Sequence, residues 1–248
     1  MIHPHPGRPL NCAHRGACKI APENTLAAFS RAIDLGAEAT ELDAQLTADG
    51  ALVACHNLAV DTTSNGHGRV AAMTLAELKA LDFGGWYAPE FAGERIPTLD
   101  EVFDLAGERL LVNVELKTVR ADGDAELARA AAALFARRNL YDRAMVSSFN
   151  PFVLMRVHAL DPRIELGLLG ARKYSLRAAS WLRPFVRVQA LHPDYTLVDA
   201  RYMAWARQRG YRVNVWTVNE EAGMRRMIDL GVDMLITDVP DRLRAVLG

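Results

Sequence analysis

The sequence has few cysteines, no long apolar run and no excess of charge of either sign. Its three cysteines, Cys12, Cys18 and Cys55, are too few and too odd in number for a disulfide framework, and no Cys-x-x-Cys pair occurs. This usage suits a reducing compartment. No stretch of about 18 apolar residues is present, as a transmembrane helix would need, and residues 1–10 lack an apolar signal-peptide core. We expect a cytoplasmic protein without a transmembrane segment.

The charge balance argues against two classes of partner. With 29 basic and 30 acidic side chains, the formal net charge is -1. The chain therefore has no global attraction to nucleic acid or to an anionic membrane. Its 248 residues, 50% of them hydrophobic, are enough to bury one sizeable core. We expect a single domain over 1–248 whose partner is a small molecule; composition does not indicate the oligomeric state.

Strand-like and helix-like segments alternate along the chain. Strands are predicted at Leu10–Ala13, Glu38–Ala44, Leu110–Leu116, Ala144–Phe149, Ile164–Leu169, Val188–Leu191, Arg212–Val218 and Met234–Thr237. Helices are predicted at Thr25–Leu35, Asp124–Asn139, Pro151–Leu160, Asp199–Arg209, Glu220–Leu230 and Pro240–Val246. Eight strands with intervening helices in about 250 residues indicate a (β/α)8 TIM barrel. The alternative is a doubly wound open sheet. That fold is expected to have a glycine-rich phosphate-binding turn after the first strand, and none is present.

One segment interrupts this alternation. Residues 51–99 hold a return strand, a glycine-rich turn at 65–68, a short helix near Thr74–Ala80 and a Gly84-Gly85 pair. We interpret this segment as an insertion after the second barrel strand, and we expect it to sit over the catalytic mouth.

A hairpin is predicted where the insertion begins. The strand that carries Glu41 and Asp43 alternates polar and apolar residues and runs into Asp49-Gly50, a two-residue hairpin signal. If those two residues form the loop, Asp43 lies opposite His56 on the return strand, with Cβ atoms roughly 5 Å apart. Two carboxylates and an imidazole would then meet on one small patch.

Three acidic residues lie near the ends of predicted strands, where functional residues of a barrel are found. Glu41 and Asp43 are on the second strand, and Glu115 is on the third. This all-oxygen set suits Mg²⁺ or Ca²⁺ better than Zn²⁺. A structural network with Arg15 and Lys117 is the alternative, but three clustered acids would repel one another without a cation. We expect one divalent cation, Mg²⁺ or Ca²⁺.

Histidine and cationic side chains occur at the same strand ends. His14 and His56 are candidates for acid–base catalysis, because imidazole titrates near neutral pH. Arg15 and Lys117 supply positive charge, and arginine offers a donor fork that fits a phosphate. Trp216 is read as a wall of the mouth, with core packing as the alternative. A metal, two cations and two histidines describe a phosphodiester site better than a carbonyl or sugar site.

These residues resemble the signature of the glycerophosphodiester phosphodiesterases. The matching motifs span nearly the whole chain in the order of the family: His14-Arg15-Gly16, Ala21-Pro22-Glu23-Asn24-Thr25, Glu41-Leu42-Asp43, His56, Ile96-Pro97-Thr98-Leu99, Asn113-Val114-Glu115-Leu116-Lys117, Trp216-Thr217-Val218-Asn219 and Thr237-Asp238-Val239-Pro240. The resemblance implies a barrel with a small insertion. The site residues that it implies are metal ligands Glu41, Asp43 and Glu115, acid–base residues His14 and His56, and substrate contacts Arg15, Lys117 and Trp216.

Two details of these motifs carry separate expectations. The family often has Asp after its second histidine, whereas this chain has Asn57, so His56 is expected to be a slightly weaker base. Glu23 and Asn24 are read as structural, since Asn24 or Thr25 can cap the first helix; a role of Glu23 around the substrate or metal is the alternative.

The leading hypothesis is metal-dependent hydrolysis of glycerophosphodiesters to an alcohol and sn-glycerol 3-phosphate. The closest alternative is a lysophospholipase D with the same site, because residues 171–188 combine five arginines and lysines with aromatic residues and no acid. That segment is either a weak interfacial contact or a solvated basic face. A metal-dependent lyase or isomerase would not need Arg15 beside paired histidines. A non-catalytic phosphate-binding module would tolerate loss of either histidine.

Overall fold

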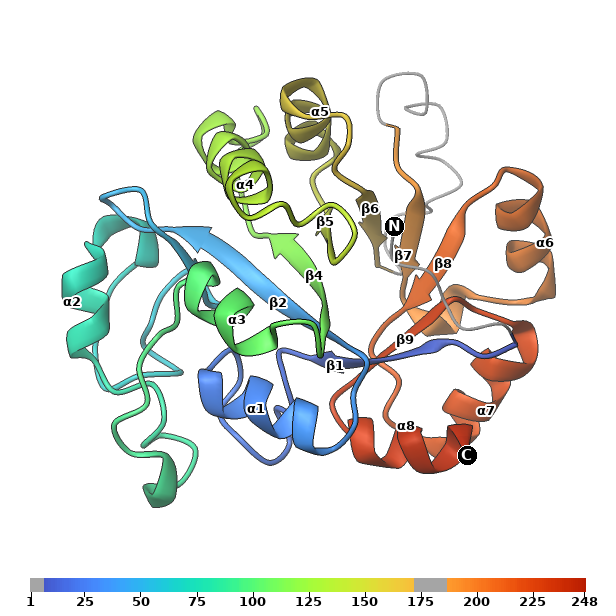
Figure 1. Cartoon of the computed structure of the whole chain (residues 1–248), viewed down its shortest axis with the longest axis horizontal. Helices are drawn as coiled ribbons and strands as arrows, with labels where there is room; N and C mark the ends of the chain where they lie inside the picture. The colour runs from blue at the N-terminus through green and yellow to red at the C-terminus, as the bar shows by residue number, and fades with distance from the viewer. Residues whose placement is uncertain (1–6, 172–186) are drawn as a thin grey trace.

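Eight parallel strands form a closed barrel in the computed structural model, which describes residues 7–171 and 187–248 (Figure 1). Within these ranges the barrel strands are β1 (Leu10–His14), β2 (Ala39–Leu46), β4 (Leu111–Leu116), β5 (Ala144–Ser148), β6 (Leu166–Gly170), β7 (Ala190–Pro193), β8 (Arg212–Val215) and β9 (Met234–Thr237). Each strand pairs with the next one along the barrel, and β1 pairs with both β2 and β9, so the ring closes. The predicted (β/α)8 barrel is confirmed.

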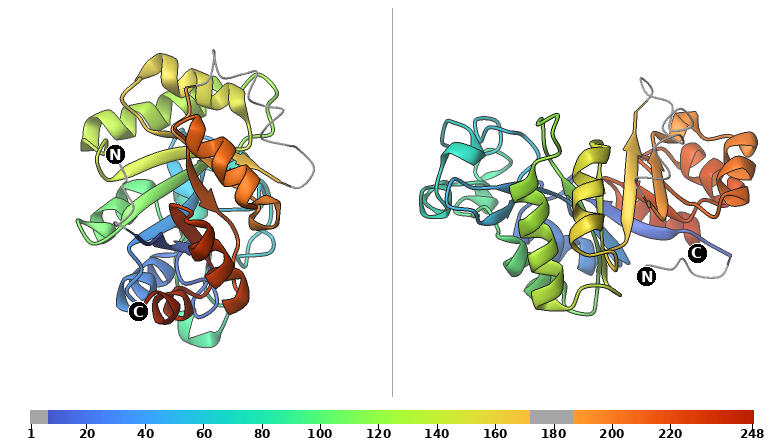
Figure 2. Two further views of the ribbon diagram at one scale, coloured as in Figure 1. Left: turned by 90° about the vertical axis from the view of Figure 1, so that its right-hand side faces the viewer. Right: turned by 90° about the horizontal axis from the view of Figure 1, so that it is seen from above.

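In the described residues, helices follow β1, β2, β4, β5, β7, β8 and β9 along the chain and lie around the outside of the barrel (Figure 2). They are α1 (Leu26–Asp34), α3 (Leu99–Ala106), α4 (Ala125–Arg138), α5 (Pro151–Leu160), α6 (Ala200–Gln208), α7 (Glu221–Leu230) and α8 (Pro240–Leu247), with a short 3-10 helix η4 (Tyr195–Leu197) before α6. Among the described residues, no helix is both long enough and apolar enough to cross a bilayer. Of the basic segment 171–188, residues 172–186 lie outside the described residues.

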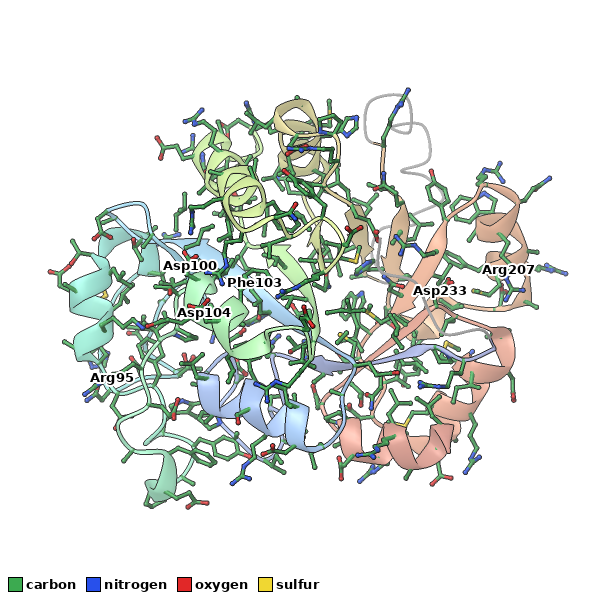
Figure 3. All side chains as sticks on the ribbon, in the orientation of Figure 1. Arg95, Asp100, Phe103, Asp104, Arg207 and Asp233 are labelled. Atoms are coloured by element: carbon green, nitrogen blue, oxygen red, sulfur yellow. The ribbon has the colours of Figure 1, made fainter. Side chains whose placement is uncertain are left out.

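Helix α3 was not among the predicted helices, although its start carries a clear signal. Thr98 and Glu101 form a capping box, in which each side chain bonds the backbone of the other residue. Phe103 on α3 is 1% exposed and packs in the main core. Asp100, labelled with Phe103 in Figure 3, accepts hydrogen bonds from Arg137 of α4 at 2.8 and 2.9 Å. An apolar face toward the sheet and ion pairs toward α4 hold this helix.

The strand register decides which side chains point into the barrel. Glu41 pairs with Asn113 of β4, and Asp43 pairs with Glu115, so these four side chains share the inner face. Lower in the barrel the inner face is largely apolar, formed by Leu10, Cys12, Ala39, Met145, Ala190, Met234 and Ile236. A second and larger apolar core fills the space between the sheet and the helices. Polar side chains thus gather toward the carboxyl ends of the strands.

The chain between β2 and α3 forms a small subsidiary structure. Its elements are β3 (Leu52–Ala54), which pairs antiparallel with β2, η1 (Val70–Ala72), α2 (Leu75–Ala80) and η2 (Pro89–Phe91). This segment has its own apolar cluster, formed by Val53, Cys55, Val60, Val70, Leu78, Phe83 and Ile96. Helix α2 agrees with the short helix predicted near Thr74–Ala80.

The hairpin between β2 and β3 differs from the predicted register by one residue. Ala44 pairs with Ala54, and the N–H of Thr47 donates to the carbonyl of Ala51 at 3.0 Å, so the loop has three residues. Gly50, at φ +81°, takes the left-handed conformation that ends such a loop.

In the observed register the residue opposite Asp43 is Cys55, whose N–H donates to the Asp43 carbonyl at 2.8 Å. The predicted pairing of Asp43 with His56 is therefore wrong. His56 follows the end of β3, so strand alternation does not set the direction of its side chain. It lines the same cavity as Glu41 and Glu115.

Candidate active site

Three carboxylates converge at the carboxyl ends of β2 and β4. Asp43 and Glu115 are register partners on neighbouring strands, and Glu41 lies two residues before Asp43 on the same face. One oxygen from each of the three lies within 4.8 Å of the other two. All three residues are buried, so the repulsion between their charges is weakly screened by solvent.

Two cationic side chains only partly neutralise this cluster. Lys117 Nζ lies 2.9 Å from Glu115 Oε1 and 3.4 Å from Asp43 Oδ1, and Arg15 Nε lies 3.2 Å from Asp43 Oδ2. Burial, followed by repulsion from Asp43, raises the pKa of Glu41 and that of Glu115. Burial also opposes ionisation of Asp43, but the charges of Lys117 and Arg15 outweigh it and lower the pKa of Asp43.

The cluster fits a hard divalent cation. Three carboxylates against two cations leave one uncompensated negative charge when all are ionised. Glu41 Oε1 is buried and has no hydrogen-bond partner, which is costly unless another group meets it. Carboxylate oxygens are the donors that Mg²⁺ and Ca²⁺ prefer. Glu41, Asp43 and Glu115 therefore have the chemistry and spacing to hold such an ion.

Arg15 and Asn24 hold their positions through unusual backbone conformations. Both have positive φ, +55° and +58°, and the Asn24 N–H donates to the Arg15 carbonyl at 3.0 Å. The Asn24 amide donates to Asp43 Oδ2 at 2.9 Å and accepts from the Asp43 N–H at 3.3 Å. Glu23 accepts from the Arg15 guanidinium at 3.1 Å. The helix cap itself is Thr25, so Asn24 and Glu23 instead orient Asp43 and Arg15.

His14 lies between two carboxylates from different strands. Its Nδ1 is 2.6 Å from Asp238 Oδ1, directly after β9, and its Nε2 is 3.9 Å from Glu41 Oε2. Asp238 also accepts from Asn219 Nδ2 at 2.7 Å. Burial opposes ionisation of Asp238, but the hydrogen bond and charge of His14, with the hydrogen bonds from Asn219 and Cys18, together outweigh it and lower the pKa of the carboxyl group. An ionised Asp238 accepts a hydrogen bond from the Nδ1–H of His14, and this bond orients the ring.

His56 has a neutral partner in place of a carboxylate. Its Nδ1 lies 3.0 Å from Asn57 Oδ1, while Asn57 Nδ2 donates to Thr62 Oγ1 at 2.7 Å. The bond to Thr62 turns the Asn57 oxygen toward the ring, so the imidazole proton belongs on Nδ1. Burial lowers the pKa of His56, and the charges of Lys117 and Arg15 lower it further against the opposing effect of Asp43. The ring is therefore neutral at pH 7, with Nε2 free to accept a proton.

One cavity of about 240 Å³ is lined by both histidines, both cations and two of the three carboxylates, Glu41 and Glu115. Its lining residues are His14, Arg15, Glu41, His56, Asn113, Glu115, Lys117, Phe149, Leu169, Trp216, Thr217 and Ile236. Trp216 follows β8 and donates from Nε1 to the His192 carbonyl at 2.7 Å. Phe149 meets Trp216 edge-on, with ring centroids 5.6 Å apart. Within the described part of 51–99, His56 is the sole residue that contributes to this lining.

The structure brings together every residue that the sequence analysis placed in the site. Sequence reasoning did not assign Phe149, which ends a predicted strand, as a second aromatic wall. It also named Asp238 without recognising it as the partner of His14. The Thr237-Asp238 motif after the last strand was the available signal, because a closed barrel places that strand beside the first.

Comparisons with known proteins agree with this geometry. The model of the glycerophosphoryl diester phosphodiesterase family matches residues 14–242. A glycerophosphodiester phosphodiesterase from Caldanaerobacter subterraneus is 42% identical over 240 residues, covering 94% of this chain and 96% of that protein.

Solved structures give the same result. A phosphodiesterase from Oleispira antarctica, solved in complex with the product sn-glycerol-3-phosphate, is 30% identical with a TM-score of 0.89 and 97% of each chain covered. A glycerophosphodiester phosphodiesterase from Agrobacterium tumefaciens is 27% identical with a TM-score of 0.82, covering 94% of this chain and 98% of that one. The chain belongs to the glycerophosphoryl diester phosphodiesterase family.

Proposed function

We propose that this protein hydrolyses glycerophosphodiesters to an alcohol and sn-glycerol 3-phosphate in the cavity at the carboxyl ends of the barrel strands. The observation that best supports this is a cavity lined by two buried carboxylates, two cations and two histidines, with the third carboxylate, that of Asp43, next to the other two. At about 240 Å³ the cavity is smaller than the roughly 300–1,000 Å³ of sites for drug-sized ligands. That size suits the glycerophosphate end of a substrate, with the alcohol directed toward solvent.

In this proposal the phosphate group lies among the charged residues. Glu41, Asp43 and Glu115 would hold one divalent cation, Mg²⁺ or Ca²⁺, which would supply positive charge for the phosphate group. Lys117 and Arg15 already lie against the carboxylates, and their remaining donors stabilise the negative charge that develops on the phosphate during reaction. This arrangement favours the transition state over the bound substrate.

The two histidines differ in their partners, and we assign their roles on that basis. His56 is neutral, carries its proton on Nδ1 and presents Nε2 to the cavity, so it takes the proton of the attacking hydroxyl group. His14 has a carboxylate beside each ring nitrogen, Asp238 at 2.6 Å from Nδ1 and Glu41 at 3.9 Å from Nε2, so each nitrogen faces an acceptor. His14 therefore gives a proton to the leaving alkoxide. Asp238 is a positioning residue that acts through His14.

The aromatic wall sets the specificity. Trp216 and Phe149 form an edge-to-face pair at the mouth and pack against the glycerol carbons. We also propose that residues 1–248 work as one domain in which 51–99 is an insertion that brings His56 to the cavity. A cytoplasmic location is proposed from the free state of Cys12, Cys18 and Cys55.

Release of sn-glycerol 3-phosphate from a panel of glycerophosphodiesters tests this function. The wild-type protein in excess Mg²⁺ should form stoichiometric amounts of sn-glycerol 3-phosphate and free alcohol. The variant Glu115→Gln, which keeps side-chain size but removes one charge, should lose at least about 10²-fold in kcat. Absence of turnover on the whole panel, or equal rates for the variant, would contradict the proposal.

A further inference from the structure

A second group of potential metal ligands lies beside the carboxylate cluster. His14 at the end of β1, Cys18 in the following loop and Asp238 after β9 bring a nitrogen, a sulfur and an oxygen within 4.8 Å of one another. Strands β1 and β9 are neighbours in the barrel, which explains how residues so distant in sequence meet (Figure 1). The Cys18 thiol donates to Asp238 Oδ1 at 3.3 Å.

We propose that His14, Cys18 and Asp238 form a second cation site, selective for a thiophilic divalent ion such as Zn²⁺, whose occupancy removes His14 from catalysis. Nitrogen, sulfur and oxygen donors are the ligands of zinc, and three protein ligands plus one water complete its tetrahedral shell. Mg²⁺ and Ca²⁺ disfavour a thiolate ligand. The two clusters therefore differ in kind: all-oxygen donors in one, mixed donors in the other.

The spacing is close to that of a zinc site. Bonds of about 2.0–2.3 Å in tetrahedral geometry separate the ligand atoms by roughly 3.3–3.8 Å. Cys18 Sγ and Asp238 Oδ1 are already 3.3 Å apart, whereas His14 Nδ1 and Asp238 Oδ1, at 2.6 Å, must separate by about 0.7 Å. All three residues are partly exposed, so an ion can reach them from solvent.

Neighbouring residues support this arrangement. Asn219 donates to Asp238 Oδ2 at 2.7 Å and accepts from the Asp238 N–H at 2.9 Å, which fixes the carboxylate and leaves Oδ1 directed at His14 and Cys18. Such bonds behind a ligand are typical of metal sites. Burial and the charge of Asp238 raise the pKa of Cys18, so the thiol is protonated at pH 7 without an ion.

Binding would proceed by exchange of one proton. The ion takes the Cys18 sulfur as thiolate, whose proton goes to solvent. It also takes His14 Nδ1, so the proton that this nitrogen shares with Asp238 moves to Nε2 by exchange with solvent. The hydrogen bond from His14 to Asp238 is lost, and the ring can no longer carry a second proton. This inhibitory consequence rests on the proposed function, whereas binding of the ion does not.

Cobalt absorption tests the binding directly. Co²⁺ added to the protein in excess Mg²⁺ should produce a sulfur-to-metal charge-transfer band, because a thiolate is a ligand. The band should disappear in Cys18→Ala and persist in Cys55→Ala, a matched control in which another thiol is removed. Cys18→Ser, which keeps a donor to Asp238, replaces Cys18→Ala if the latter does not fold. A missing band in the wild type, or one that survives both Cys18 substitutions, would overturn the site.

Zinc titration in millimolar Mg²⁺ tests the consequence. Micromolar Zn²⁺ should reduce wild-type turnover of glycerophosphocholine by about tenfold or more and reduce that of Cys18→Ala by less than about twofold. Equal inhibition of the two proteins would place the zinc at the carboxylate cluster and overturn the regulatory consequence. If the protein shows no phosphodiesterase activity, the proposed function fails while the cobalt band still decides the site.

Discussion

Loss of the Asp238 carboxylate should lower turnover by roughly two to four orders of magnitude. Its bond to His14 Nδ1, at 2.6 Å, joins a carboxylate to an imidazole, and hydrogen bonds to charged groups contribute about 1.5–3 kcal/mol. In Asp238→Asn the new amide must turn its N–H groups toward His14 or toward Asn219, both of which are donors now. If the new amide N–H faces an N–H of His14 or Asn219, the unpaired donor costs about 1–3 kcal/mol in addition to the lost bond. The alternative is that His14 changes tautomer.

A combined loss of roughly 2.5–6 kcal/mol corresponds to a decrease of about 70- to 25,000-fold in kcat. The assay is release of sn-glycerol 3-phosphate from glycerophosphocholine, with kcat and KM determined separately. KM should change much less than kcat, because Asp238 acts on the ring of His14 and does not line the cavity.

Asn219→Ala is the matched control, because it removes the two hydrogen bonds between Asn219 and Asp238 and keeps the charge. Loss of the bond to the carboxylate, the one of the two that bears on His14, should cost about 0.5–1.5 kcal/mol, or roughly 2- to 13-fold in kcat. If Asp238→Asn stays within threefold of the wild type, or if Asn219→Ala is equally damaging, the reasoning that Asp238 acts by its charge on His14 is refuted.

Three further outcomes are expected. His56→Ala and His14→Ala should each lower kcat by about 10²-fold or more with an unchanged melting temperature, and a near-wild-type kcat in either variant would remove that histidine from the mechanism. Glycerophosphocholine and glycerophosphoethanolamine should turn over within about tenfold of each other, while an aryl diester without glycerol should be a poor substrate; rapid turnover of the aryl diester would show that the pocket is misread. Phe103→Ala should lower the free energy of unfolding by about 3–5 kcal/mol in urea titrations, because the side chain is 1% exposed, and a loss below about 1 kcal/mol would contradict its place in the core.

The barrel and most of its site could be predicted from short stretches of sequence, because both the strand and helix patterns and the polar residues at the strand ends are local features. Alternating strand and helix patterns indicate the fold, and the ends of parallel strands meet on one face of it. Asp43 and Glu115 are neighbours for that reason, and their strands pair in the register that aligns them. The position of Lys117, 2.9 Å from Glu115, follows from the same strand periodicity.

The parts that were missed depend on the loops and on closure of the ring. The hairpin register turned on whether the loop has two or three residues. A two-residue type I′ loop needs positive φ at both Asp49 and Gly50, and of these two Gly50 alone has it, at +81°. The pairing of His14 with Asp238 spans 224 residues and exists only because the last strand lies beside the first. Phe149 meets Trp216 across the mouth, a contact between side chains that no local pattern encodes.

The most direct test of the account is the dependence of hydrolysis on a divalent cation held by Glu41, Asp43 and Glu115. Their oxygens lie within 4.8 Å of one another, and Glu41 Oε1 has no protein hydrogen-bond partner. The measurement is the rate of sn-glycerol 3-phosphate release from glycerophosphocholine by chelator-treated protein, before and after addition of Mg²⁺ or Ca²⁺. The account predicts no measurable turnover in excess chelator and recovery of the rate with one of the two ions. Full turnover in excess chelator would contradict it.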